Sequence, residues 1–240
     1  MASRNDQEQA PSRRAKLGHH LRKYLKLLTP TDEFIIVVVA ALGVTLFVNF
    51  YVILFAERGV PVITEAGLRT LLIDEPVILL IVATFLWARD WTFETIGLLP
   101  SLKETLFGVG LALVIAFVGM AVWFVIALVG LPRPAAPEVA AGPFNQITIL
   151  AVSMLNPIFE ESVLCGYIVT ALKRRSTAQM AVAVSVALRA LCHLYQGFGL
   201  VFIVIFGVVL AWWYARHGRL WPLIIAHVMY DFFPLQAYQG

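Results

Sequence analysis

The sequence predicts an all-α fold, a polytopic transmembrane helical bundle with about seven spans. Composition is the first observation: 60% of the 240 residues are hydrophobic and only 14% are charged, whereas a soluble domain carries about 25% charged residues. The second is the arrangement of the apolar residues, which gather in long runs. These runs approach the roughly 20 residues that a membrane-spanning helix needs.

Seven apolar runs define the expected helices in chain order. The fifth and sixth runs are near the short limit for a span, and the third is long enough to cross the bilayer at a tilt. No internal repeat divides the chain, so we expect one membrane domain over residues 31–240, with a motif-bearing core over about 147–237. The expected spans are 33–56, 72–88, 105–131, 147–172, 178–196, 199–215 and 220–237.

The first thirty residues are polar and basic, and they contain no apolar segment of the kind that a secretory signal peptide requires. We expect residues 1–30 to form a cytoplasmic basic tail. With this end inside, 14 of the 18 Lys and Arg residues fall in inner segments, three in outer segments and Arg189 within a span. The positive-inside rule therefore predicts a cytoplasmic N-terminus, and we expect a prokaryotic plasma membrane.

Charge and cysteine content exclude other classes of protein. The net charge of +3 comes from the tail and the inner loops, so the lipid bilayer is the expected partner and nucleic acid is not. The two cysteines, Cys165 and Cys192, both fall inside predicted spans. This position excludes an extracellular disulfide framework.

Ionisable side chains are distributed unevenly among the spans. In the N-terminal half, Asp74 and Glu75 lie at the start of a span, and we assign both to the membrane surface. In the C-terminal half, three spans carry ionisable groups well inside, where such groups face the bundle interior and by default mark a functional site. They are Glu160 and Glu161 in the fourth span, Arg189 and His193 in the fifth, and His227 and Asp231 in the seventh.

The spacing of these residues indicates how they face one another. Arg189 and His193 are four residues apart and therefore share one helical face, and the same holds for His227 and Asp231. The two glutamates are adjacent, so their side chains point about 100° apart. One glutamate can face a cavity while the other turns toward a neighbouring helix, which suggests one chemical and one structural role.

The set of two carboxylates and two histidines favours hydrolysis of a peptide or ester inside the membrane. A glutamate beside a histidine can take a proton from water and deliver hydroxide to a carbonyl carbon. A second histidine with a polar neighbour can donate hydrogen bonds to the oxyanion that forms. A serine mechanism is disfavoured because Ser162 and Ser185 have no histidine at local spacing. A catalytic thiol is disfavoured because both cysteines lie in predicted helices as small apolar residues. Zinc stays an alternative, although no HExxH pattern occurs.

At these residues the sequence resembles the CPBP family, the CAAX proteases and bacteriocin-processing enzymes, also called the Abi family of intramembrane proteases. Three motifs carry that family: EExxxR, FxxxH, and HxxxN or HxxxD. They are found here at Glu160–Cys165, Arg189–His193 and His227–Asp231, with the spacing inside each motif intact. The resemblance covers about residues 150–235, and the first 130 residues match only as hydrophobic spans.

The resemblance implies an all-helical, glutamate-dependent membrane endopeptidase that acts on a peptide or a lipidated protein. Eukaryotic members remove the last three residues from prenylated CAAX proteins, and the sequence leaves bacteriocin leader peptides and membrane-protein tails open as substrates of this chain. Carried over, Glu160 and His193 activate water, while His227 and Asp231 support the oxyanion. An ionised Asp231 cannot donate a hydrogen bond, so it orients His227 or acts while protonated. A metal-free mechanism is the one generally favoured for this family. If zinc is bound, the expected ligands are Glu160, His193 and His227.

Two positions depart from the family pattern. Cys165 stands where EExxxR has its arginine, and Arg189 stands where FxxxH has its phenylalanine. The fourth span has thus lost a cation one turn after Glu161, and the fifth has gained one. We predict that Arg189 reaches across the helix interface as the structural partner of Glu161, because an isolated arginine in a membrane costs several kcal/mol. The alternative is a decayed site whose charges pair by chance.

Two rival functions stay open. One is a catalytically impaired homologue that acts as an immunity or scaffold membrane protein. The other is a proton-coupled transporter with a relay of buried acids and histidines, although the chain lacks the repeat and paired short spans typical of transporters. Straight helices would also place His227 about 12 Å, Glu160 about 20 Å and His193 about 27 Å from the inner loops. We expect Pro157 to kink the fourth span and reduce this mismatch.

Overall fold

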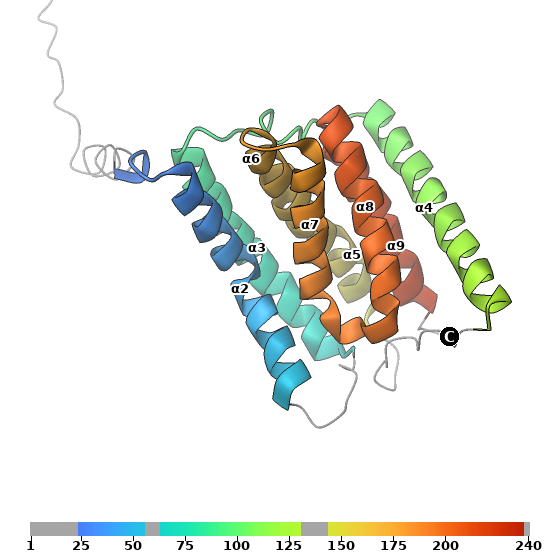
Figure 1. Ribbon diagram of the computed structural model, residues 1–240. Coiled ribbons are helices and arrows are strands. Elements are labelled where there is room, and N and C mark those ends of the chain that lie inside the picture. The colour runs from blue at the N-terminus through green and yellow to red at the C-terminus, as the bar shows by residue number, and fades with distance from the viewer. Residues whose placement is uncertain (1–23, 56–62, 131–143, 238–240) are drawn as a thin grey trace, which may run out of the picture.

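The computed structural model describes residues 24–55, 63–130 and 144–237. Within these ranges every long element is a helix, and successive helices run in alternate directions through one bundle (Figure 1). The first half contains α2 (Pro30–Phe55), α3 (Glu65–Ala88) and α4 (Leu102–Leu128). The second half contains α5 (Gln146–Glu161), α6 (Thr170–Lys173), α7 (Ala178–Cys192), α8 (Leu200–His217) and α9 (Trp221–Ala237). The predicted all-α fold class is confirmed.

Helices occupy all seven predicted spans, although their lengths differ. Five segments in the described ranges have the length and hydropathy of a membrane span: α2, α3, α4, α8 and the continuous run Gln146–Lys173. That run joins α5 to α6 through a π-helical segment, Ser162–Val169. The fifth predicted span, 178–196, is wrong at its end, because α7 stops at Cys192 after 15 residues and the chain continues as a 3-10 helix, Leu194–Gly199.

Short polar side chains begin four of the helices. Thr64, Ser101, Asn145 and Thr177 precede α3, α4, α5 and α7, and each accepts a hydrogen bond from a backbone N–H of the first turn. These N–H groups have no partner inside the helix, so a side-chain acceptor at this position stabilises the helix start by about 1 kcal/mol. The caps fix where each chain segment enters the bundle.

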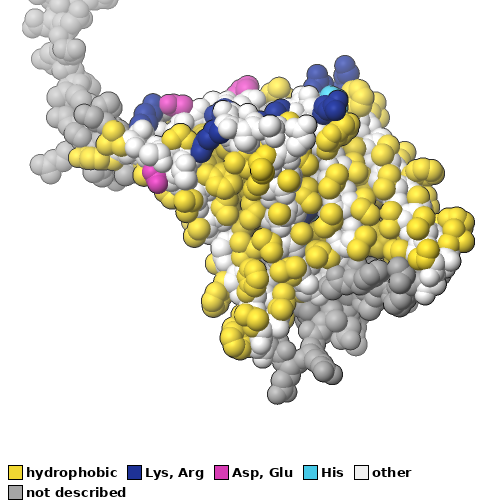
Figure 2. All heavy atoms as spheres, viewed as in Figure 1, with side chains coloured by type: hydrophobic (Ala, Val, Ile, Leu, Met, Phe, Trp, Pro, Cys, Tyr) yellow, Lys and Arg dark blue, Asp and Glu magenta, His cyan; other side chains and the backbone are white. Residues whose placement is uncertain are grey.

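Apolar side chains cover the outside of the bundle. Large hydrophobic residues are well exposed on successive helices, including Phe47 at 71%, Ile81 at 59% and Phe117 at 69%. Figure 2 shows hydrophobic side chains over the flank of the molecule, whereas Lys and Arg gather along one end. A continuous apolar surface of this kind is unfavourable in water, and with the five long apolar helices it makes this a multi-pass membrane protein.

The basic residues of the predicted inner loops lie together at that end. The turn between α6 and α7 and the turn between α8 and α9 lie at the same end of the bundle (Figure 1). Arg174 and Arg175 lie in the first turn, Arg216 and Arg219 flank the second, and all four are exposed. The grouping fits the predicted topology, while the assignment of this end to the cytoplasm stays a prediction. Most of the predicted basic tail, residues 1–23, lies outside the described residues.

A buried glutamate joins three parts of the bundle at its basic end. Glu33, in the first turn of α2, forms an ion pair with Arg89 just after α3. The same carboxylate accepts hydrogen bonds from Trp91 Nε1 and Tyr167 Oη, each at 3.2 Å. Because Tyr167 belongs to the π-helical segment, this cluster holds that segment against α2 and the loop after α3.

The loop after α3 also sets the level at which α9 begins. Gly97 has a φ of +68°, and a Cβ on it would lie 1.8 Å from the carbonyl oxygen of Gly218. Only glycine combines this backbone conformation with so close an approach. The Gly97 carbonyl in turn accepts a 2.8 Å hydrogen bond from the N–H of Leu220. The start of α9 is therefore drawn into the bundle, and Leu220 is fully buried.

Candidate active site

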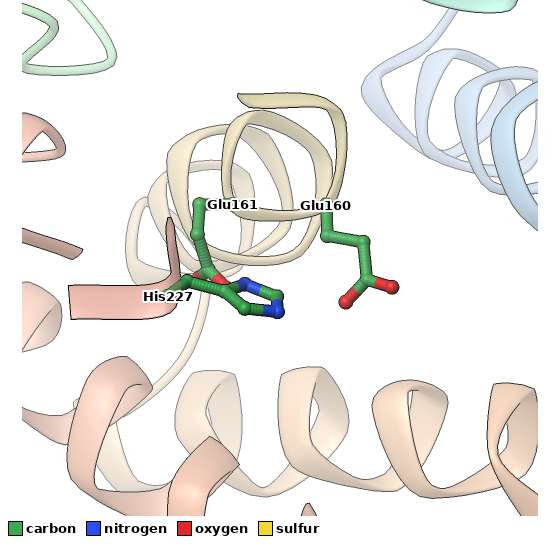
Figure 3. A group of neighbouring side chains, drawn as sticks. All are labelled: Glu160, Glu161 and His227. Carbon is green, nitrogen blue, oxygen red and sulfur yellow. The ribbon is translucent and has the colours of Figure 1, made fainter. Parts of the chain in front are cut away.

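The two adjacent glutamates lie at the end of α5 and point in different directions. Glu161 is fully buried and directs its carboxylate toward the ring of His227, whereas Glu160 points to the other side of the helix (Figure 3). The side chain of Glu160 retains 15% exposure. The π-helical segment begins directly after them, and wider winding of this kind is frequent at functional sites.

Arg189 contacts both glutamates from the neighbouring helix α7. Its Nη2 lies 2.7 Å from Glu161 Oε1, the partner that the sequence predicts. Its Nη1 lies 3.0 Å from Glu160 Oε2, a contact that the sequence does not predict. The arginine side chain is only 2% exposed. A planar guanidinium can donate to two acceptors at once, so one buried cation pairs with the fully buried Glu161 and the partly buried Glu160.

The neighbouring helix α8 makes room for this arginine. A Cβ on Gly207 would lie 3.1 Å from Arg189 Cδ, so a larger residue there would press on the side chain. The ring of Phe206 lies beneath the guanidinium, with 5.4 Å from Cζ to the ring centroid, a favourable cation–π distance. Cys165 is fully buried and lies near enough to Glu161 and Arg189 to interact with both.

His193 follows α7 and faces Glu160. Its Nδ1 lies 2.9 Å from the carbonyl oxygen of Arg189. A carbonyl only accepts, so this bond places the proton of a neutral ring on Nδ1 and leaves Nε2 as an acceptor. Nε2 lies 3.8 Å from Glu160 Oε1. That separation is too long for a direct hydrogen bond, but one water molecule can bond to both atoms.

His227 lies between two carboxylates. Its Nδ1 is 2.7 Å from Glu161 Oε1, and its Nε2 is 3.4 Å from Asp231 Oδ1. A neutral ring can donate from only one nitrogen, so both contacts are hydrogen bonds only when the ring carries two protons. Phe206 packs edge-on against the same ring at 4.9 Å. The ring is therefore fixed on the Glu161 side and held more loosely on the Asp231 side.

Two residues that sequence reasoning did not place in the site join it. The assignment of Glu75 to the surface is wrong: this α3 residue is 8% exposed. Asn156 Nδ2 donates to Glu75 Oε1 at 2.8 Å and to Glu160 Oε1 at 3.4 Å. Asn156 precedes Glu160 by four residues and so shares its helical face, a signal that the sequence offered. Glu75 gave no comparable signal, because hydropathy places it at a span boundary.

A cavity of about 620 Å³ collects these groups. Its walls come from α2, α3, α4, α5, α8, α9 and the end of α7, and its remaining lining is largely apolar. Four of the six predicted site residues line it; Glu161 and Arg189 lie behind the wall and support it. The carboxyl and imidazole side chains that line the cavity are Glu75, Glu160, His193, His227 and Asp231.

The helices bring these residues together because they start at different levels. The first turn of α7 is exposed, from Ala178 to Met180, whereas Leu220 and Leu223 at the start of α9 are fully buried. The straight-helix estimate assumed equal levels and is therefore wrong. Pro157 lies within α5, and the change in winding comes after it, in the π-helical segment.

The fit of a metal ion can be judged from the donor atoms. Glu160, Glu161 and His227 offer ligand atoms within 4.8 Å of one another. The predicted zinc set had His193 in place of Glu161. Zinc in the observed group would share both carboxylates with the buried guanidinium of Arg189, which already supplies their positive partner. Arg189 binds one oxygen of each carboxylate and would repel a second cation beside it, so this arrangement favours the guanidinium over a zinc ion.

Comparison with known families finds a match over the part of the chain that contains the three motifs. Residues 142–233 match the model of the family described as type II CAAX prenyl endopeptidase Rce1-like. No curated protein and no solved structure matches the chain. The matched range runs from just before α5 into α9 and contains all three motifs. Residues 142–233 are therefore similar to the Rce1-like CAAX endopeptidases, in agreement with the family of intramembrane proteases that the motifs resemble.

Proposed function

We propose that this protein is a glutamate-dependent intramembrane endopeptidase that hydrolyses a peptide bond near the membrane in a peptide or a lipidated protein. The family match supports a CAAX-type intramembrane protease. The observation that carries the residue-level proposal is the pair formed by Glu160 Oε1 and His193 Nε2, 3.8 Å apart on the wall of the cavity. These are the two positions to which the family resemblance assigns water activation.

Water activation follows from the acceptors on this pair. His193 Nε2 accepts one hydrogen of a water molecule, because the Arg189 carbonyl holds the ring proton on Nδ1. Glu160 Oε1 accepts the other hydrogen and takes that proton as the water oxygen attacks the substrate carbonyl carbon. Arg189 binds the second oxygen, Oε2, which leaves Oε1 as the oxygen that takes the proton.

His227 is placed to stabilise the oxyanion. Its Nε2 lies on the cavity side and is bound to Asp231 over 3.4 Å, a long contact that a stronger acceptor can replace. An oxyanion within about 3 Å of Nε2 would gain the charge-assisted hydrogen bond that Asp231 gives up. Glu161 keeps the ring in place through Nδ1. The C–N bond then breaks, and Glu160 returns its proton to the leaving amine.

We further propose the topology and the absence of a metal from this mechanism. The basic end, with the exposed turns after α6 and α8, would face the cytoplasm of a prokaryotic cell by the positive-inside rule. The buried guanidinium of Arg189 supplies the positive charge beside the two carboxylates, so the chemistry is assigned to the side chains alone.

The proposal is tested by cleavage assays on purified protein in liposomes. Glu160→Gln and His193→Ala should each lower kcat at least about a hundredfold, the usual contribution of a general base. Glu94→Gln removes an exposed acid outside the site and should leave kcat unchanged. The substrates are prenylated and unprenylated CAAX peptides together with a library of unmodified peptides. Full activity of Glu160→Gln would refute the proposal, and no cleavage by the wild-type protein would favour a scaffold or transport role.

A further inference from the structure

Helix α3 brings a third glutamate to the cavity from outside the family match. Glu75 is 8% exposed and lines the same cavity as Glu160, whereas its neighbour Asp74 is exposed. Residue 75 lies far from the matched range, 142–233. A carboxyl group inside a membrane protein costs several kcal/mol unless other groups form hydrogen bonds or ion pairs with it. A glutamate at this position therefore suggests a functional or structural role.

The contacts of Asn156 indicate that role. Its Nδ2 lies 2.8 Å from Glu75 Oε1 and 3.4 Å from Glu160 Oε1. An amide nitrogen carries two hydrogens, so it can donate one to each carboxyl group. The shorter bond to Glu75 fixes the plane of the amide, and the second hydrogen is then directed at Glu160. Glu75 thus acts on Glu160 through one intervening side chain.

The consequence is that Glu160 is held from two sides. Arg189 on α7 binds Oε2 at 3.0 Å, and Asn156 reaches Oε1. A carboxylate held only at Oε2 can turn about its terminal bond, since that torsion is broad. The amide opposes this rotation on the side where Oε1 faces His193.

We propose that Glu75 is a positioning residue that acts through Asn156 to keep Oε1 of Glu160 directed at His193, and that the role requires its acceptor oxygen and not its charge. This inference rests on the proposed role of Glu160 as the base. It assigns to the N-terminal half of the chain a part in the chemistry, since α3 then completes the support of a residue on α5.

Kinetics on matched variants test the inference. Glu75→Leu removes the acceptor and should lower kcat by about 10- to 100-fold with KM within about twofold, since a small misplacement of a reacting group costs up to about 100-fold. Glu75→Gln keeps an acceptor oxygen and should restore kcat to within about threefold of wild type. Asp74→Asn, the adjacent acid, should have no effect. Glu75→Leu combined with Asn156→Leu should be no slower than Asn156→Leu alone, because both act along one path.

A second readout does not depend on turnover. The infrared band of the Glu160 carboxylate is identified as the band that Glu160→Gln removes, in the wild type and in the Glu75→Leu background. The band should shift in Glu75→Leu and stay in place in Glu75→Gln and Asp74→Asn. An unshifted band with wild-type kcat in Glu75→Leu would overturn the inference, as would a loss in Glu75→Gln equal to that in Glu75→Leu. If the wild type cleaves no substrate, the proposed function fails, and the band alone decides whether Glu75 positions Glu160.

Discussion

Arg189 shows how one side chain can carry a charge that the motifs of the similar family place at another position. At position 189 the motif expects an aromatic ring, and at position 165 it expects the arginine. The guanidinium lies between Glu160 and Glu161 at 3.0 and 2.7 Å. Gly207 leaves space for its stem, and the Phe206 ring supports its head. The arrangement therefore needs suitable residues on three helices and not only an exchange of two positions.

Removing this arginine should destabilise the protein strongly. Arg189→Phe introduces the motif residue but removes the guanidinium from the fully buried Glu161 and the partly buried Glu160, and breaking a buried ion pair costs about 3–5 kcal/mol. Adding Cys165→Arg should recover much of the loss, because position 165 is one turn after Glu161 and is fully buried. Thermal unfolding in detergent measures both variants. As a control, Arg69→Ala removes an arginine with 62% exposure and should cost less than about 1 kcal/mol.

The hypothesis that Arg189 replaces the missing motif arginine is tested by the order of the unfolding temperatures of the single and double variants. The double variant must unfold at a higher temperature than Arg189→Phe alone. Equal midpoints for the single and double variants would show that the contacts of Arg189 do not substitute for the missing motif arginine.

At the scale of single residues, the sequence revealed charges in apolar surroundings but not neutral or boundary residues. The six ionisable residues of the three motifs stand out inside the predicted spans. Asn156 is uncharged, and Glu75 lies at the start of a predicted span, where a charged side chain can reach the membrane surface without a free-energy penalty. Whether such a side chain turns inward depends on how the helix packs, and a hydropathy pattern gives only its depth.

At the scale of elements, the winding of the chain after the glutamates differs from a uniform helix. Residues Ser162–Val169 are π-helical, so their carbonyl groups leave the usual α-helical partners. Side chains from other helices reach two of these carbonyls: Ser185 Oγ donates to Leu164 O at 2.8 Å, and Tyr214 Oη donates to Gly166 O at 3.3 Å. The sequence predicted one span over 147–172 but not this winding, because these bonds depend on neighbouring helices.

Ser185 should therefore contribute to stability beyond its small size. Ser185→Ala removes the 2.8 Å hydrogen bond to the buried Leu164 carbonyl, and the loss of one such bond costs about 0.5–1.5 kcal/mol. Ser153 is a matched control: it is also fully buried, and its Oγ makes no hydrogen bond within the described part of the chain. Ser153→Ala should be neutral or stabilising in the same thermal unfolding measurement. Equal losses in the two variants would contradict this account of the π-helical segment.

At the scale of the whole molecule, the sequence predicted the helices of the bundle but not the relative heights that bring the polar side chains into contact. The positions of the seven predicted spans follow from apolar runs alone, and five helical segments of the described ranges have the length and hydropathy that the bilayer requires. The levels at which the helices start do not follow, since the contact between Gly97 and Gly218 and the burial of Leu220 come from packing. For this reason the straight-helix estimate separated residues that lie in contact.

Chelators should leave peptidase activity intact if the side chains alone carry the reaction. Activity of the purified protein should be unchanged after prolonged incubation with EDTA and with 1,10-phenanthroline. Metal analysis of the same samples should find less than about one zinc per ten chains, because Arg189 already binds the carboxylates that zinc would need. Loss of activity that added zinc restores would overturn the metal-free mechanism.

The motif residues and much of the surface that faces them come from different parts of the chain. The motif residues all lie within 142–233, whereas α2, α3 and α4 supply much of the surface that faces them. Residues of the first half can therefore be exchanged without changing the proposed reacting groups. A chimaera that takes residues 24–130 from another protein with the same motifs should keep the chemistry proposed for this chain and take the substrate preference of the other protein.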